Sequence, residues 1–140
     1  MLTLGAPSAQ TTVTLAKGVS VTVRPATSVD VLAAEGEAAR LMKAALDGAA
    51  LTEILQFGVS SDGPDLNQAP IRAAWTRFVI DVLLAEQVIS AWDGIGDASG
   101  SPIAPNRAAI AALLQDPVRR RPIMTAIEAP LHAVEDEAKK

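Results

Sequence analysis

Side chains that could carry out acid–base, nucleophilic or metal chemistry are few in this sequence and far apart. Its 140 residues include one histidine, His132, and no cysteine. A protein zinc site usually combines several histidine or cysteine ligands, so His132 would need carboxylates alone to complete one. No serine lies in the strand–turn–helix context of an activated nucleophile. We interpret His132 as a surface or capping residue, and we expect neither a metal site nor a catalytic triad.

Four aspartates, Asp62, Asp65, Asp93 and Asp97, lie in segments rich in turn-forming residues. Paired carboxylates are a common acid–base device, and a calcium loop places oxygen ligands over about twelve residues before a closing glutamate. The run 93–104 has no acidic residue near its end, and the glycines of 94–100 are not followed by the lysine of a phosphate-binding loop. Turn formation is therefore the preferred role. We expect no cofactor, and an enzyme that uses these carboxylates is the less favoured alternative.

The composition restricts the classes of partner. The formal net charge is −4, and the one basic run, Arg119 to Arg121, is short, so we expect no nucleic-acid partner. Hydrophobic residues make up 49% of the chain but aromatic residues only 3%, which favours helices packed through small side chains. The apolar stretch 78–85 contains Asp81 and is too short to span a bilayer, and the N-terminus does not resemble a signal peptide. These features predict a soluble cytoplasmic protein.

Alternating apolar and polar residues predict a β-hairpin over 11–25, with a turn at Lys17-Gly18 and a stop at Pro25. A helical region follows over 28–87. It comprises a helix capped by Thr27 or Ser28 that ends near Gly48, a short helix over 49–57, and a long helix that begins at Pro70. We expect residues 88–95 to form a third strand, although an extension of the preceding helix is the alternative.

A turn region over 88–104 leads to helices over 105–135, which the Asp116-Pro117 pair divides. Pro122 and Pro130 are expected to start or kink the last helix, and Val118 is expected on its apolar stripe. The predicted fold is therefore α+β: a single domain, 1–140, with a small antiparallel sheet packed on four to five helices. The apolar faces of the last two helices are expected to be core or a partner-binding surface, with these candidate residues: Ile110, Leu113, Leu114, Ile123 and Ile127.

The order of these elements resembles that of one protein family. A valine-rich hairpin ending in Val-Thr-Val-Arg-Pro-Ala is followed by an amphipathic helix and then by the run from Ile89 to Ile103, which includes Trp92, Asp93, Gly94, Gly100 and Pro102. A helix opened by Pro105 with an Ile110, Leu113, Leu114 face and a last helix after Pro117 complete the pattern. Over residues 11–135 it resembles tail assembly chaperones of long-tailed bacteriophages, prophages and gene-transfer-agent-like elements.

The resemblance implies a non-enzymatic function. Such a chaperone coats the hydrophobic, helical tape-measure protein in the cytoplasm of the bacterial host, keeps it soluble, and is displaced as the tail-tube protein polymerises. It is absent from the mature particle, and a ring or spiral of its own copies is expected. The alternative within the same setting is a structural tail or head–tail connector protein. The run around Trp92 is interpreted as architecture, because no catalytic partner accompanies it.

Overall fold

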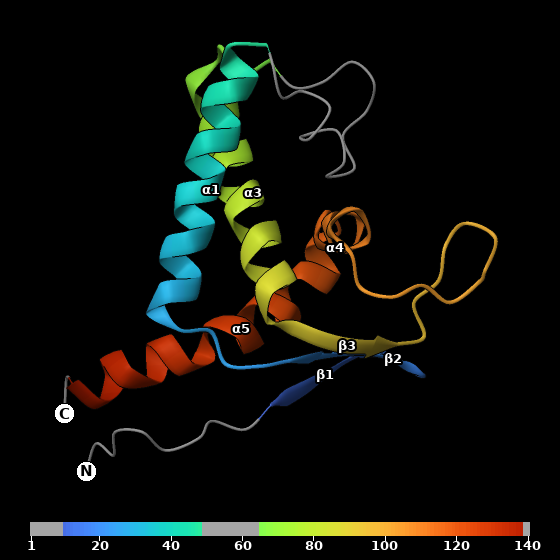
Figure 1. The fold of residues 1–140 in the computed structure, drawn as a ribbon. Helices are drawn as coiled ribbons and strands as arrows, with labels where there is room; N and C mark the ends of the chain where they lie inside the picture. Colours follow the sequence, from blue (N-terminus) through green and yellow to red (C-terminus); the bar gives the residue numbers. More distant parts are fainter. Residues whose placement is uncertain (1–9, 49–64, 139–140) are drawn as a thin grey trace.

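A computed structural model describes residues 10–48 and 65–138, and only the backbone of 130–138. Within these residues the chain forms an α+β fold with a three-stranded antiparallel sheet and four helices, which confirms the predicted class (Figure 1). The predicted helix over 49–57, Asp62 and the side chain of His132 lie outside the described residues. The elements are β1 (Thr11–Ala16), β2 (Val19–Val23), α1 (Ser28–Leu46), α3 (Ala69–Val88), β3 (Ile89–Asp93), α4 (Arg107–Leu114) and α5 (Pro117–Ala138).

The sheet has the order β1-β2-β3, with the predicted hairpin at one side and the predicted third strand at the other. Gly18 closes the hairpin with a φ of 77°, a left-handed conformation that glycine adopts without steric cost. Val21 and Val23 alternate toward the core from the central strand and are fully buried. Strand β3 pairs with β2 from Ser20–Asp93 to Val23–Ile89, so the strand interpretation of this segment is confirmed.

Helix α1 begins with a capping box. The Thr27 hydroxyl accepts a hydrogen bond from the Asp30 backbone N–H at 3.2 Å, and the Asp30 carboxylate accepts one from the Thr27 N–H at 2.9 Å. The two nitrogens of the Arg24 guanidinium also donate to Asp30, at 2.8 and 2.9 Å. This fork ties the end of β2 to the start of α1, and with the Thr27 donors it holds the pKa of Asp30 well below its usual range.

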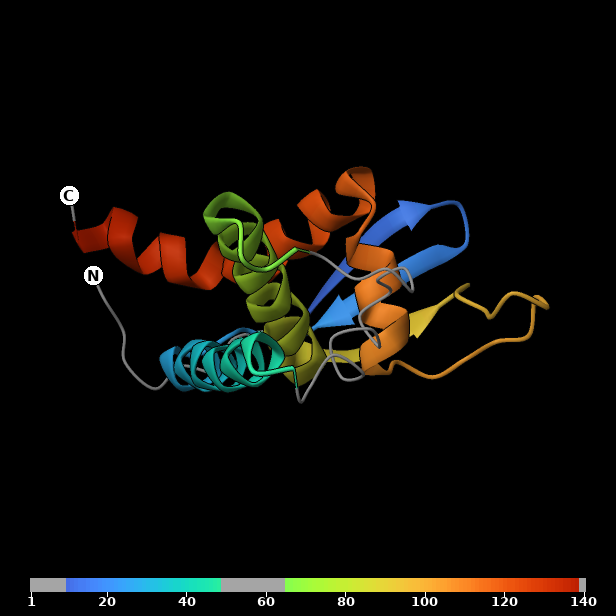
Figure 2. The ribbon, with the colours of Figure 1, turned by 90° about the horizontal axis from the view of Figure 1, so that it is seen from above.

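Helices α1 and α3 pack side by side in opposite directions, and α3 passes straight into β3 at Ile89 (Figure 1). Ala34, Ala38 and Ala45 bring the two backbones close, while Leu41 fills the contact. Seen from above, α1 lies at the edge of the fold, whereas α3 lies between α1 and the pair α4 and α5 (Figure 2). Helix α3 is therefore central to the helical layer.

The last two helices begin where the sequence predicts. Asn106 accepts from the Ala109 N–H at 2.9 Å to cap α4, and Asp116 accepts from the Val118 N–H at 2.9 Å as α5 begins at Pro117. Helix α5 continues through Pro122 and Pro130, so neither proline starts it. The prediction that Val118 lies on the buried stripe is wrong: its side chain is 80% exposed, because in the first turn of α5 it faces solvent.

Candidate functional site

The run around Trp92 serves the architecture of the described fold. The indole Nε1 of Trp92 donates to the Ile103 carbonyl at 2.7 Å, and the Ile103 N–H donates to the Ile95 carbonyl at 3.2 Å, which closes the loop between β3 and α4. Gly94 has a φ of 76° and lies against the backbone of Gly18 in the hairpin turn. The Gly96–Pro102 bridge adds a second closure.

Asp97 organises the tip of the same loop. Its Oδ1 accepts hydrogen bonds from the Ser99 N–H, the Ser99 hydroxyl and the Ser101 N–H, at 2.9, 2.6 and 3.1 Å. These donors lower the pKa of the Asp97 carboxyl, the Ser99 hydroxyl most of all. A carboxylate stabilised in its ionised form is a poor proton donor at neutral pH. Asp97 therefore has the turn-forming role that its sequence context predicts, as does Asp65, which accepts from the Asn67 N–H at 3.1 Å.

The five residues proposed as a partner-binding face do not form a surface. Their side chains are between 0 and 8% exposed, because the apolar stripes of α4 and α5 both turn toward α3 and the sheet. These side chains therefore belong to the core of the described fold, and Leu114 also lines the groove described below. A partner-binding role for the two stripes stays a prediction. Those five residues are Ile110, Leu113, Leu114, Ile123 and Ile127.

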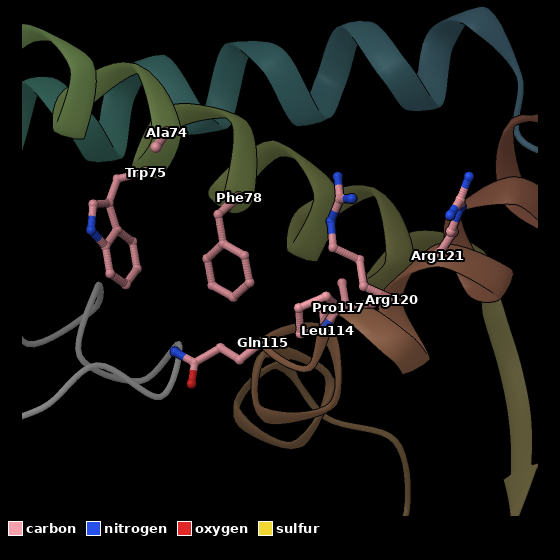
Figure 3. A pocket seen from close by; sticks show the side chains of 8 residues that line it. All are labelled: Ala74, Trp75, Phe78, Leu114, Gln115, Pro117, Arg120 and Arg121. Carbon is pink, nitrogen blue, oxygen red and sulfur yellow. The ribbon is translucent and has the colours of Figure 1, made fainter.

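An apolar groove lies between α3 and the junction of α4 with α5 (Figure 3). It encloses about 630 Å³. Trp75 and Phe78 project from α3 along one side, with ring centroids 5.5 Å apart and planes at 87°, an edge-to-face pair. The other side comes from the helix junction. The full lining is Ala74, Trp75, Phe78, Leu114, Gln115, Pro117, Arg120 and Arg121.

A buried carboxylate beneath the groove holds one of its arginines. Asp81 on α3 is 1% exposed, and its Oδ2 accepts hydrogen bonds from Nε and Nη2 of Arg120 on α5. Arg77 Nε lies 3.3 Å from Asp81 Oδ1, an electrostatic contact without hydrogen-bond geometry, and Arg77 Nη2 donates to Glu128 at 3.1 Å. This cluster joins α3 to α5 and fixes the guanidinium of Arg120 at the groove.

Arg121 carries the groove's other positive charge. Its side chain is exposed, and among the described residues no ion pair or hydrogen bond of Arg121 is found. Among the described residues that line it, the groove contains no carboxylate, hydroxyl or histidine. It therefore lacks groups for acid–base or nucleophilic chemistry, but it offers an apolar slot with positive charge along one rim. Such a surface suits a row of apolar side chains with an acidic residue next to it.

Trp75 and Phe78 lie on the apolar stripe of the predicted long helix that begins at Pro70, and the sequence does not single them out as surface residues. Both are only partly buried, and the signal available was their bulk in a chain with few aromatics. In residues 10–48 and 65–129, whose side chains the structure describes, no three His, Asp or Glu side chains gather closely enough to hold a metal ion. The helices of the same residues do not combine the length and apolar character needed to cross a membrane.

Comparison of the chain with protein-family models, with curated proteins and with solved structures finds no match. The groove and its chemistry are therefore the guide to function, together with the sequence pattern around Trp92.

Proposed function

We propose that the protein is a tail assembly chaperone that binds apolar helical segments of a tape-measure protein and keeps that protein soluble in the host cytoplasm. The observation that supports this proposal most directly is the apolar groove beside Trp75 and Phe78 with arginines on its rim. A chaperone for a long helical protein needs a surface that accepts apolar side chains reversibly. Tail-tube subunits then displace it, and it stays out of the finished particle.

The dimensions and the chemistry of the groove fit one face of an amphipathic helix. Side chains at positions i, i+3 or i+4, and i+7 of a helix lie in a row, and two or three of them fill a slot of several hundred Å³. The edge-to-face pair of Trp75 and Phe78 offers a large apolar contact area at little cost in side-chain entropy. The occupant we propose is an amphipathic helix with a glutamate or aspartate facing Arg121.

Binding at one groove is expected to be weak, because the slot accepts only a few side chains. Many copies bound along one helical filament give avidity, while each copy can still leave when tail-tube subunits compete for the tape measure. The sequence resemblance to tail assembly chaperones led to this proposal, and the groove supplies a surface on which it can be tested.

The test is co-expression with the tape-measure protein of the same locus, followed by fractionation and pull-down. We expect the tape-measure protein to be soluble and co-purified only when this chain is present. Ala74→Glu places a carboxylate in the apolar part of the groove and should abolish co-purification. Ala73→Glu makes the same change at the neighbouring exposed alanine of α3, outside the groove, and should leave it intact.

Three results would overturn the proposal. The first is a tape-measure protein that is equally soluble alone, and the second is equal binding by the two alanine variants. The third is the presence of this chain at stoichiometric levels in purified particles by mass spectrometry, which would favour a structural tail or connector protein. Trp75 fluorescence, measured in a Trp92→Phe background so that Trp75 is the one tryptophan, tests what occupies the groove. If replacing apolar residues of 49–57 changes this fluorescence, the groove is occupied by a segment of the chain itself, and not by a partner.

A further inference from the structure

Helix α1 carries a second apolar stripe on the side opposite α3. Its buried residues, such as Ala34, Ala38 and Leu41, all face α3. Three of the four large apolar side chains that are strongly exposed in the described residues lie on the opposite side: Val29 is 74% exposed, Leu32 65% and Leu46 46%. This apolar row contributes nothing to the core that the described residues form.

The spacing of this stripe is that of a coiled-coil seam. Exposed residues alternate at intervals of three and four, which is the a and d pattern of a heptad: Val29, Leu32, Gly36, Ala39, Lys43 and Leu46. The seam is about 26 Å long at 1.5 Å per residue. We call these six residues the α1 seam. Figure 2 shows α3 on one side of α1 and no other described helix or strand covering the opposite side.

Gly36 at the centre of the α1 seam is unexplained by the fold of one copy. A glycine in a helix interior lowers stability relative to alanine. A Cβ built at Gly36 would meet no atom within 4 Å, so no contact among the described residues requires the small residue. Glycine and alanine at the middle of a seam allow a second helix backbone to approach closely, as Gly36 and Ala39 would here.

The charges beside the α1 seam complement a second copy of the same helix. Glu35 and Arg40 lie on opposite flanks of the seam, five residues apart, at the g and following e positions. In a parallel, in-register pair, the g residue of one helix faces the following e residue of the other, so Glu35 of each copy meets Arg40 of the second copy. Nη2 and Nε of Arg40 donate hydrogen bonds to the Glu37 carboxylate of the same helix at 2.6 and 3.0 Å, which keeps the Arg40 guanidinium on that flank.

We propose that the α1 seam is a dimer interface, in which two copies of the chain pair through parallel α1 helices about a twofold axis that runs along them. Val29, Leu32 and Leu46 then meet their own counterparts, and the two Gly36 residues let the backbones approach. Lys43 is the one charged seam residue, and a single lysine at an a position restricts register and the number of helices at a cost in affinity. The pairing is therefore reversible.

This interface is independent of the groove. The groove lies on the side of α3 that faces α4 and α5, whereas the α1 seam faces away from α3. Each copy in the pair keeps its groove open. A failure of the tape-measure experiment therefore leaves the dimer proposal standing, and a failure of the dimer experiment leaves the groove proposal standing.

Sedimentation equilibrium of the whole protein from about 1 µM to about 500 µM tests the pairing. We expect a reversible dimer of twice the 14.5 kDa chain mass. Leu32→Glu should raise the dissociation constant at least about tenfold, because it places two unpaired carboxylates in the seam. The control is Val118→Glu, which makes the same kind of change at an exposed residue of α5 and should leave the dissociation constant unchanged.

The orientation is tested with single cysteines, since the chain has none of its own. Leu46→Cys should form an intermolecular disulfide on mild oxidation, because a parallel pair brings the two 46 positions together. An antiparallel pair would instead crosslink an equimolar mixture of Val29→Cys and Leu46→Cys chains and leave Leu46→Cys alone uncrosslinked. That result, a monomer at every concentration, or equal dimerisation of Leu32→Glu and the control would overturn the proposal.

Discussion

Two glycines of the same loop should respond very differently to the same substitution. Gly94 and Gly100 both have left-handed backbones, with φ of 76° and 85°. Alanine in this conformation costs about 1–2 kcal/mol at either position. A Cβ at Gly100 would meet nothing within 4 Å, whereas a Cβ at Gly94 would lie 2.1 Å from the carbonyl oxygen of Gly18. The second contact is with backbone, which cannot turn away as a side chain can.

The expected losses in the free energy of unfolding follow from these distances. Gly100→Ala should lose only the backbone term, about 1–2 kcal/mol. Gly94→Ala must also push the β1–β2 turn away from β3, and forced overpacking adds about 1–3 kcal/mol. The total for Gly94→Ala is therefore about 2–5 kcal/mol, and the variant should lose more stability than Gly100→Ala by the overpacking term.

Urea unfolding followed by far-UV circular dichroism measures both losses. The midpoint should fall further for Gly94→Ala, while the slope of free energy against urea stays the same in both variants, since the surface exposed on unfolding does not change. Equal midpoints would show that the hairpin turn moves freely relative to β3. The contact between Gly94 and the Gly18 backbone would then not hold the strand and the turn rigidly together.

Two further predictions concern side chains near the sheet. Because Arg24 and Thr27 lower the pKa of Asp30, its ionised form stabilises the fold above the unfolded value of about 3.9, and that stability is lost as the pH falls below it. Asp30→Asn should therefore lower the free energy of unfolding by about 2 kcal/mol at pH 7. In this variant the urea midpoint should also decline less between about pH 5 and about pH 2 than in the parent protein, and an unchanged decline would contradict the prediction. Trp92→Phe should lower the free energy of unfolding by about 1 kcal/mol, because the Ile103 carbonyl loses its donor. Trp92→Ala should lower it by about 2–3 kcal/mol, because the ring is only partly buried. Thermal unfolding of the two Trp92 variants separates the hydrogen bond from the packing, and equal losses would show that the ring contributes nothing beyond its N–H.

Local signals in the sequence predicted the elements well. The alternation over 11–25 predicted the hairpin, and Thr27 and Asp116 each predicted the start of a helix, because capping and strand alternation depend on residues close in the chain. The third strand was predicted from its flanking glycine turns, and the structure places it at Ile89–Asp93. These features need no knowledge of the tertiary fold.

Features that join distant segments were not predictable in the same way. Asp81 and Arg120 are 39 residues apart, and nothing in the sequence indicates that they form a buried pair. The apolar faces of α4 and α5 illustrate the same limit. A stripe that contains Ile110 or Ile123 has the same pattern whether it faces the core or a partner, and only the packing decides. The groove was missed because Trp75 and Phe78 lie on a stripe whose other members are core.

The direct passage from α3 into β3 has a consequence for how reliably the chain finds its native pairing. Val88 ends the helix and Ile89 begins the strand, so no loop residue separates them. A one-residue slip of β3 along β2 would reverse the faces of its side chains, and it would also carry the end of α3 out of place against α1. An error in strand register therefore also disrupts helix packing, and the reverse. A misaligned sheet is penalised in both layers, which widens the energy gap between the native fold and its nearest competitors.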